Sequence, residues 1–163
     1  MLVPMYAALR FAMATVAAFA LGTGAAWAEG VDILVLGPPA LKATFAEIVP
    51  VFESVSGNRL VLKFDSAAAL KRSIDAGEAF DLAILSPAHI DELSAQGKIA
   101  PGSRIDVARS AEVSASLKNA TTFTAAIALQ ARDPEAARAF LTYLMSSPVS
   151  EVLEDNGMQR AAR

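Results

Sequence analysis

The stretch that decides the fold runs from Val31 to Gly57, VDILVLGPPALKATFAEIVPVFESVSG, and contains one complete strand–helix unit. Its first six residues, 31–36, are nearly continuous in apolar side chains, which is typical of a strand covered on both faces. Residues with helical spacing follow and predict one apolar stripe along a helix: Leu41, Phe45, Ile48, Phe52 and Val55. Gly57 stops this helix in a position that favours glycine, and Pro50 is expected to kink the helix or shift its last turn.

The same alternation occurs twice more before residue 98. The predicted elements are strands at 59–64 and 81–85 and helices at 67–76 and 88–96, the helices being followed by Gly77 and Gly97. Three strand–helix units with short connections predict a parallel sheet with right-handed crossovers. We therefore expect an α/β fold with three layers, in which helices cover both faces of a doubly wound, mostly parallel sheet.

The rest of the chain begins irregularly. Residues 99–120 have no clear period, although 105–108 can form a short strand, and a further strand is predicted at 121–129.

Two helices are predicted near the C-terminal end. Asp133-Pro-Glu135 supplies an N-cap, a first-position proline and a first-turn acid. The helix that it opens is expected to bury Ala137, Phe140, Leu141 and Leu144. Ser147-Pro148 repeats the combination of cap and proline for a last helix, which is expected to end near Gly157.

The first 28 residues have the pattern of an export signal. Arg10 is the only charged residue among them and precedes an apolar run at 11–21. Ala26-Trp-Ala28 then provides the small-x-small pattern that a signal peptidase cleaves. The alternative is a membrane anchor, but a spanning helix needs about 20 strongly apolar residues, whereas this run is shorter and rich in alanine. We predict a signal peptide at 1–28, cleavage after Ala28 and a mature protein in the periplasm.

Composition excludes several classes of function. Because Arg10 is the only charge in the predicted signal, the 135 residues that follow carry 13 Lys and Arg against 17 Asp and Glu, a net charge of −4. A mildly acidic chain without a basic run argues against nucleic acid as a partner. The chain has no cysteine, so disulfides, thiolate chemistry and Cys-ligated metals are excluded.

A binding site is expected where the predicted parallel strands end. In an open parallel sheet, ligands bind beyond the carboxyl ends of the strands, which here are the turns 37–40, 65–67 and 86–87. Each turn lies at or next to a helix start, where free backbone N–H groups and the helix dipole favour an anion. Ser66 and Ser86 add hydroxyl donors. The alternative is that both serines only cap their helices.

Candidates for catalysis are few. His89 is the single histidine, and its place in the first turn of a helix predicts a solvated surface residue. Asp32 and Asp81 are expected to mark the starts of strands at the opposite end of the sheet, and Arg132 to be an exposed loop charge. No Gly-x-Ser-x-Gly elbow accompanies the histidine. We therefore expect no enzyme, no cofactor and no metal site.

The order of the segments resembles a known family. Residues 34–45, LVLGPPALKATF, residues 64–74, FDSAAALKRSI, and residues 81–86, DLAILS, are similar to molybdate-type substrate-binding proteins of ABC transporters. The segments 102–110 and 133–158 continue the resemblance, which covers nearly all of the chain after Ala28. It implies the type II periplasmic binding fold, a small-molecule or oxyanion ligand, either molybdate-like or organic, and an ABC permease as partner.

One departure from the family concerns its second lobe. Members of the family clamp the ligand between two lobes, and the second lobe lies between segments that match residues 108–110 and 117–119 here. Because only a few residues separate these segments, a stretch the size of a small domain, about a hundred residues, is expected to be missing. The resemblance thus implies a single lobe at 29–163, with strand–helix units at 29–110 and a returning segment at 111–163.

A second departure concerns the ligand. The hydroxyls with which the family coordinates an oxyanion in its first two turns match Ala40 and Ala67, whereas the third turn retains Ser86 and Ser66 neighbours the second. The predicted ligand-binding residues are Pro39, Ala40, Ser66, Ala67 and Ser86. Two side-chain donors are lost, and a desolvated dianion needs fully satisfied partners, so an organic or less charged ligand is as compatible as molybdate.

An alternative function follows from the missing lobe. The chain can be an internally deleted relic or an interaction protein without a competent ligand cleft, since burying a small ligand normally requires concavity. The face left by the missing lobe would then favour self-association.

Overall fold

The computed structural model describes residues 30–110 and 121–161. The predicted signal peptide therefore lies outside the described residues. In chain order, the elements are β1 (Asp32–Gly37), η1 (Pro39–Leu41), α1 (Lys42–Ser56), β2 (Arg59–Phe64), α2 (Ala67–Asp75), β3 (Leu82–Leu85), α3 (Pro87–Ala95), β4 (Ile105–Ser110), β5 (Thr122–Ile127), α4 (Pro134–Leu144), α5 (Ser147–Asp155) and β6 (Met158–Arg160). Within this part of the chain, no helix is long and apolar enough to cross a membrane.

The strands form one sheet in the order β2-β1-β3-β5-β4-β6. β1 is parallel to β2, in a register that runs from Asp32 opposite Arg59 to Gly37 opposite Phe64, and it is also parallel to β3. The expected parallel arrangement of the first three strands is therefore present. The returning half adds antiparallel pairings of β5 with β3, β4 with β5 and β6 with β4, so the sheet is mixed and not mostly parallel as expected.

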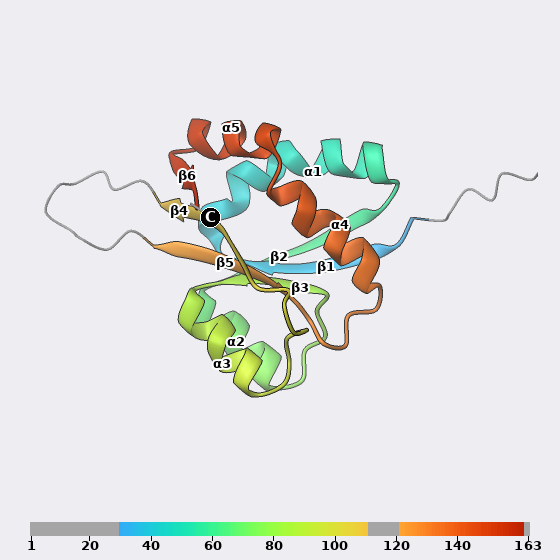
Figure 1. The fold of residues 1–163 in the computed structure, drawn as a ribbon, viewed down its shortest axis with the longest axis vertical. Helices are drawn as coiled ribbons and strands as arrows, with labels where there is room; N and C mark the ends of the chain where they lie inside the picture. The colour runs from blue at the N-terminus through green and yellow to red at the C-terminus, as the bar shows by residue number, and fades with distance from the viewer. Residues whose placement is uncertain (1–29, 111–120, 162–163) are drawn as a thin grey trace, which may run out of the picture.

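Helices cover both faces of the sheet, as expected for a doubly wound fold. α1, α4 and α5 lie on one face, and α2 and α3 on the other (Figure 1). The strand order explains this division, because β2 and β3 flank β1 on opposite sides. The crossover from β1 to β2 and the crossover from β2 to β3 therefore run in opposite directions along the sheet. Because both are right-handed, α1 lies on one face and α2 on the other.

Alternating side chains of the strands supply two hydrophobic cores. Ile33 and Val35 pack with α1, α4 and α5, whereas Leu36 packs with α2 and α3. The same alternation divides Ile84 from Leu85 on β3. Successive residues of a strand point to opposite faces, so the apolar runs that predicted buried strands line two separate cores.

The predicted helix ends agree with the structure at most positions. Gly57 follows α1 with a φ of 72°, and α4 begins after Asp133, whose side chain accepts a hydrogen bond from the N–H of Ala136. α1 runs through Pro50 to Ser56. The N-cap of α5 is Ser146, one residue earlier than expected, and its side chain makes no capping bond.

Candidate functional site

The carboxyl ends of β1, β2 and β3 lie at one edge of the sheet, which we call the ligand edge. Gly37 and Phe64, the last residues of β1 and β2, are paired, and the N–H of Asp65 donates to the carbonyl of Gly37 at 3.2 Å. β3 is parallel to β1 and runs toward the same edge. The starts of η1, α2 and α3 follow directly, so three helix N-termini meet where the sequence predicted a ligand.

The first turn of the ligand edge offers backbone donors only. Pro39 and Ala40 are exposed at the start of η1. The first N–H groups of a helix have no intrahelical acceptor, and proline has no N–H, so Ala40 provides the free donor of this turn. The N–H of Leu41 is already used, because it donates to the carbonyl of Pro38 at 3.1 Å.

The second turn is capped by Ser66. Its Oγ accepts a hydrogen bond from the N–H of Ala69 at 3.3 Å, as the capping interpretation of this serine predicted. The Asp65 carboxylate accepts from the N–H of Ser66 at 2.7 Å. A capping hydroxyl accepts with a lone pair and keeps its hydrogen, so exposed Ser66 can still donate to a ligand beside half-buried Ala67.

The third turn differs from the second. Ser86 is the N-cap of α3, but its side chain makes no capping bond. Instead, its Oγ lies 2.7 Å from Nδ1 of His89. His89 is therefore half-buried and bonded at the ligand edge, not a solvated surface residue as the sequence suggested. The signal for this contact was available, since residues three apart are neighbours on a helix.

Asp81 lies at the opposite edge and does more than mark the start of a strand. Its buried carboxylate accepts from the N–H of Leu34 at 2.8 Å, the N–H of Arg132 at 2.7 Å and the Arg132 guanidinium at 2.9 Å. Burial raises the pKa of Asp81, but the bonds from Arg132 and Leu34 outweigh burial and hold the pKa below its usual value. Arg132, expected to be a simple exposed charge, is thus an ion-pair partner.

A second group of charges joins α2 to the residues around α3. Lys71 and Lys98 both bind the carboxylate of Asp75, at 2.7 and 2.9 Å, and lower its pKa to about 2. Lys71 also lies 3.2 Å from Glu92 of α3. The basic side chains of this group are therefore committed to ion pairs and are not ligand donors.

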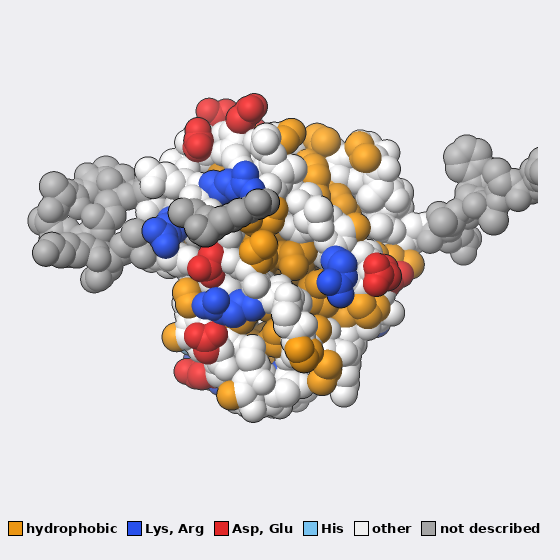
Figure 2. Space-filling model, viewed as in Figure 1, with side chains coloured by type: hydrophobic (Ala, Val, Ile, Leu, Met, Phe, Trp, Pro, Cys, Tyr) orange, Lys and Arg blue, Asp and Glu red, His pale blue; other side chains and the backbone are white. Residues whose placement is uncertain are grey.

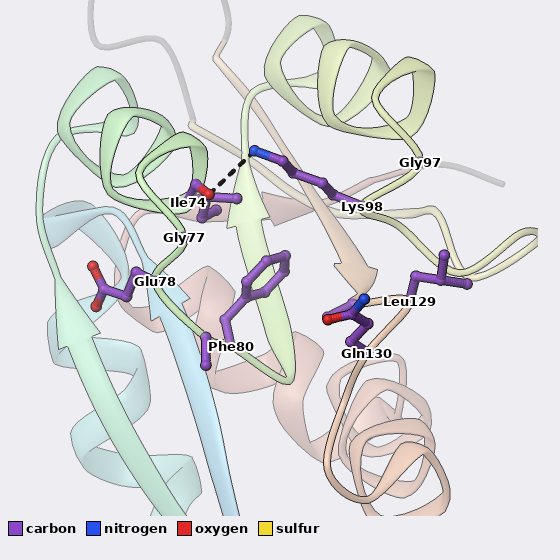
Figure 3. Close-up of a pocket in the computed structure, with 10 residues that line it drawn as sticks. Ile74, Gly77, Glu78, Phe80, Gly97, Lys98, Leu129 and Gln130 are labelled. Carbon is purple, nitrogen blue, oxygen red and sulfur yellow. Dashed lines mark hydrogen bonds between the residues drawn. The ribbon is translucent and has the colours of Figure 1, made fainter.

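A pocket of about 300 Å³ lies away from the ligand edge (Figure 3). It opens between the C-terminal ends of α2 and α3, with Phe80 at its centre and Leu129 and Gln130 at one side. Lys98 at its rim donates to the carbonyl of Ile74 at 3.1 Å. None of the five predicted ligand residues lines this pocket, and the sequence did not predict it.

The chemistry of the ligand edge suits binding more than covalent catalysis. A serine nucleophile needs a base that is itself oriented by a third group, and His89 bonds only to Ser86 among the described side chains. No cluster of three His, Cys, Asp or Glu side chains that could hold a metal ion occurs in residues 30–110 and 121–161.

Comparison with known proteins agrees with the fold. The profile of a family described as bacterial extracellular solute-binding protein matches residues 33–120 and 110–159. These two matches meet at 110–120, the place where the sequence departs from the two-lobed family. No curated protein matches the chain.

Solved structures show the same fold at low sequence identity. The substrate-binding domain described for a molybdenum ABC transporter from Clostridium difficile gives a TM-score of 0.71 at 12% identity, covering 82% of this chain and 100% of that chain. The periplasmic molybdate-binding protein of Azotobacter vinelandii gives 0.69 at 11% identity, covering 80% and 99%. The tungstate-binding protein TupA of Desulfovibrio alaskensis gives 0.62 at 7% identity, covering 82% and 100%. The chain belongs to the bacterial extracellular solute-binding proteins and forms a single lobe of the type II periplasmic binding fold.

Proposed function

We propose that the chain is the periplasmic solute-binding component of an ABC-type importer and binds a small anion at the ligand edge. The contacts are the backbone N–H groups near Pro39, Ala40 and Ala67 and the hydroxyls of Ser66 and Ser86. The observation that carries this proposal is the convergence of three helix N-termini on one edge of the sheet. The related structures named for molybdate and tungstate support an oxyanion or a small organic anion as the ligand.

The proposal includes export and a partner. The segment 1–28 acts as a signal peptide that is removed after Ala28, and the remaining lobe at 29–163 delivers its ligand to an ABC permease. The family description, which names extracellular solute-binding proteins, supports this location.

Ligand binding is tested on the purified protein with molybdate, tungstate, sulfate and small carboxylates. We expect heat in calorimetric titration and a higher melting temperature, because a ligand at 100 times its Kd stabilises the folded state by about 2.7 kcal/mol. If no compound of the panel produces heat or a thermal shift, the proposal is wrong.

The Ser66→Asp variant tests the location of the site. Aspartate is a good N-cap, so α2 is expected to remain capped while a negative charge is placed at the ligand edge. Anion affinity should fall about tenfold, which corresponds to about 1.4 kcal/mol. Ser94→Asp is the matched control, because Ser94 is an exposed residue in the last turn of α3. Equal losses of affinity in the two variants would place the anion elsewhere.

The second candidate function is an interaction protein without ligand binding. The observation that favours it is the openness of the ligand edge: Pro39, Ala40 and Ser66 are exposed, and the hollow of about 300 Å³ is elsewhere. Among the described residues, the large apolar side chains left exposed are Val51, Val55 and Leu129. Figure 2 also shows hydrophobic side chains over the middle of one face. Analytical ultracentrifugation at rising protein concentration tests this second function. A protein that remains monomeric at every concentration contradicts self-association.

A further inference from the structure

The two serines of the ligand edge have different partners. Ser66 accepts from a backbone N–H of its helix, as an N-cap does. Ser86 holds the same position in α3 but is bonded to the ring of His89, with 2.7 Å between Oγ and Nδ1. The donor capacity of the third turn therefore depends on where the imidazole carries its proton.

The chemistry of this contact depends on whether Nδ1 carries a proton, as it does in the imidazolium and in one of the two neutral tautomers. When Nδ1 carries no proton, it accepts the Ser86 hydroxyl hydrogen, and Oγ presents only lone pairs to a ligand. When Nδ1 is protonated, the ring donates to Oγ, and the hydroxyl hydrogen is released to bind an anion. The imidazolium form also places a positive charge beside that anion.

We propose that His89 is a positioning residue that couples anion binding at Ser86 to protonation of its ring. This inference rests on the proposed binding of an anion at the ligand edge. A bound anion favours the imidazolium, which donates from Nδ1 to Ser86 and places its positive charge beside the anion. A ring that is neutral before binding therefore takes up one proton from the buffer when a fully deprotonated anion binds. The third turn thus acts as a proton-linked donor, while the first two turns donate independently of any titrating side chain.

The charged groups around α3 leave this role to His89. β5, which packs against α3, carries no ionisable side chain. Several charged groups near α3 bond to one another or to neighbours: Asp91 with Arg104 at 3.1 Å, Glu92 with Lys71 at 3.2 Å, and Asp65 with the N–H of Ser66 at 2.7 Å. Arg72 of α2 is exposed. Asp106 of β4 accepts from Thr124 at 2.6 Å. In the described part of the chain, the bonded partner of the ring is the neutral hydroxyl of Ser86.

Calorimetric titration with sulfate tests the coupling. Sulfate stays fully deprotonated near neutral pH, so any proton taken up enters the protein. Titrations at one pH in two buffers with different ionisation enthalpies should give different heats for the wild type and equal heats for His89→Gln, whose amide can bond to Ser86 without titrating. Wild-type affinity should fall about fivefold between roughly pH 6 and 8, the range in which histidine titrates, and the affinity of His89→Gln should stay constant.

Nuclear magnetic resonance gives an independent readout, because His89 is the only histidine of the chain. In untagged protein, the ring nitrogen signals should move toward those of an imidazolium, with both nitrogens protonated, when sulfate is added. If sulfate binds with equal heats in both buffers, no proton is taken up, whether or not the ring changes its neutral tautomer. The coupling is then wrong and the binding proposal stands. If the wild type binds no sulfate, this inference is overturned, and the rest of the anion panel decides the binding proposal.

Discussion

At the scale of single residues, Asp81 holds together segments that are far apart in the sequence. Its carboxylate binds Leu34 of β1 and Arg132 beyond β5, while its backbone bonds to Leu34 and Ala128 at 2.9 Å each. The residue is 1% exposed. This single side chain therefore links β1 to the segment after β5, at the edge of the sheet opposite the ligand edge.

Replacement of Asp81 by asparagine should destabilise the fold. An amide offers one acceptor where three N–H groups now bind two carboxylate oxygens, and hydrogen bonds to charged groups contribute about 1.5–3 kcal/mol each. We expect the free energy of unfolding, measured with urea, to fall by about 2–3 kcal/mol. The expected loss is not larger because Arg132 is exposed and solvent weakens its ion pair. The control is Asp32→Asn, because the ion pair of Asp32 with Arg59 is exposed on both sides. Equal stability of wild type and Asp81→Asn would contradict this role.

The contribution of Asp81 should depend on pH in a defined direction. Its folded pKa lies below the usual value, so the folded state holds the carboxylate in its ionised form. The stabilisation is complete above the unfolded pKa of about 3.9 and is lost as the pH falls through the folded pKa. The difference in unfolding free energy between wild type and Asp81→Asn should therefore be constant near neutrality and shrink in acid. A difference that persists unchanged down to about pH 2 would exclude this linkage.

At the scale of elements, the end of α1 is specified by one glycine. Gly57 has a φ of 72°, and its N–H donates to the carbonyl of Glu53 at 2.9 Å. A side chain at this φ is strained, although a Cβ would meet no atom within 4 Å. The requirement is therefore conformational and not steric.

The variant Gly57→Ala should lower the free energy of unfolding by about 1 kcal/mol, because only glycine adopts the left-handed region without cost. Gly37→Ala is the matched control: a Cβ there would meet only the Phe64 ring at 3.8 Å, and the residue has no positive φ. Thermal unfolding of both variants provides the measurement. If Gly37→Ala is the more destabilised variant, packing and not φ limits these positions.

At the scale of the whole molecule, the ligand edge is open to solvent in the described part of the chain, where Pro39, Ala40 and Ser66 are exposed. The described residues form one lobe around one sheet. Saturating sulfate or molybdate should therefore leave the radius of gyration unchanged in small-angle X-ray scattering. A decrease would reveal a closing motion, and an increase with protein concentration would favour self-association.

The sequence by itself determined the local elements. Residues 31–36 were recognisable as a strand because a continuous apolar run indicates burial on both faces. The strand predicted at 59–64 has the predicted bounds as β2, although it lies at the edge of the sheet and only Leu60 in it is buried. Helix ends at Gly57 and Asp133 follow from cap chemistry that acts within a few residues. The ligand edge was also predictable from the order of elements, because parallel strands with short helical connections bring their carboxyl ends to one side of the sheet.

Only the tertiary structure decided which distant segments meet. The antiparallel direction of β4, β5 and β6, the bond from Asp81 to Arg132 across 51 positions and the pocket beside Phe80 all depend on how the returning segment docks on the sheet. Periodicity indicates which face of an element is buried but does not specify its neighbour. His89 is a different case, because its contact with Ser86 lies within one helical turn and its spacing of three residues already signalled it. Only the half-buried state of the ring depended on the tertiary structure.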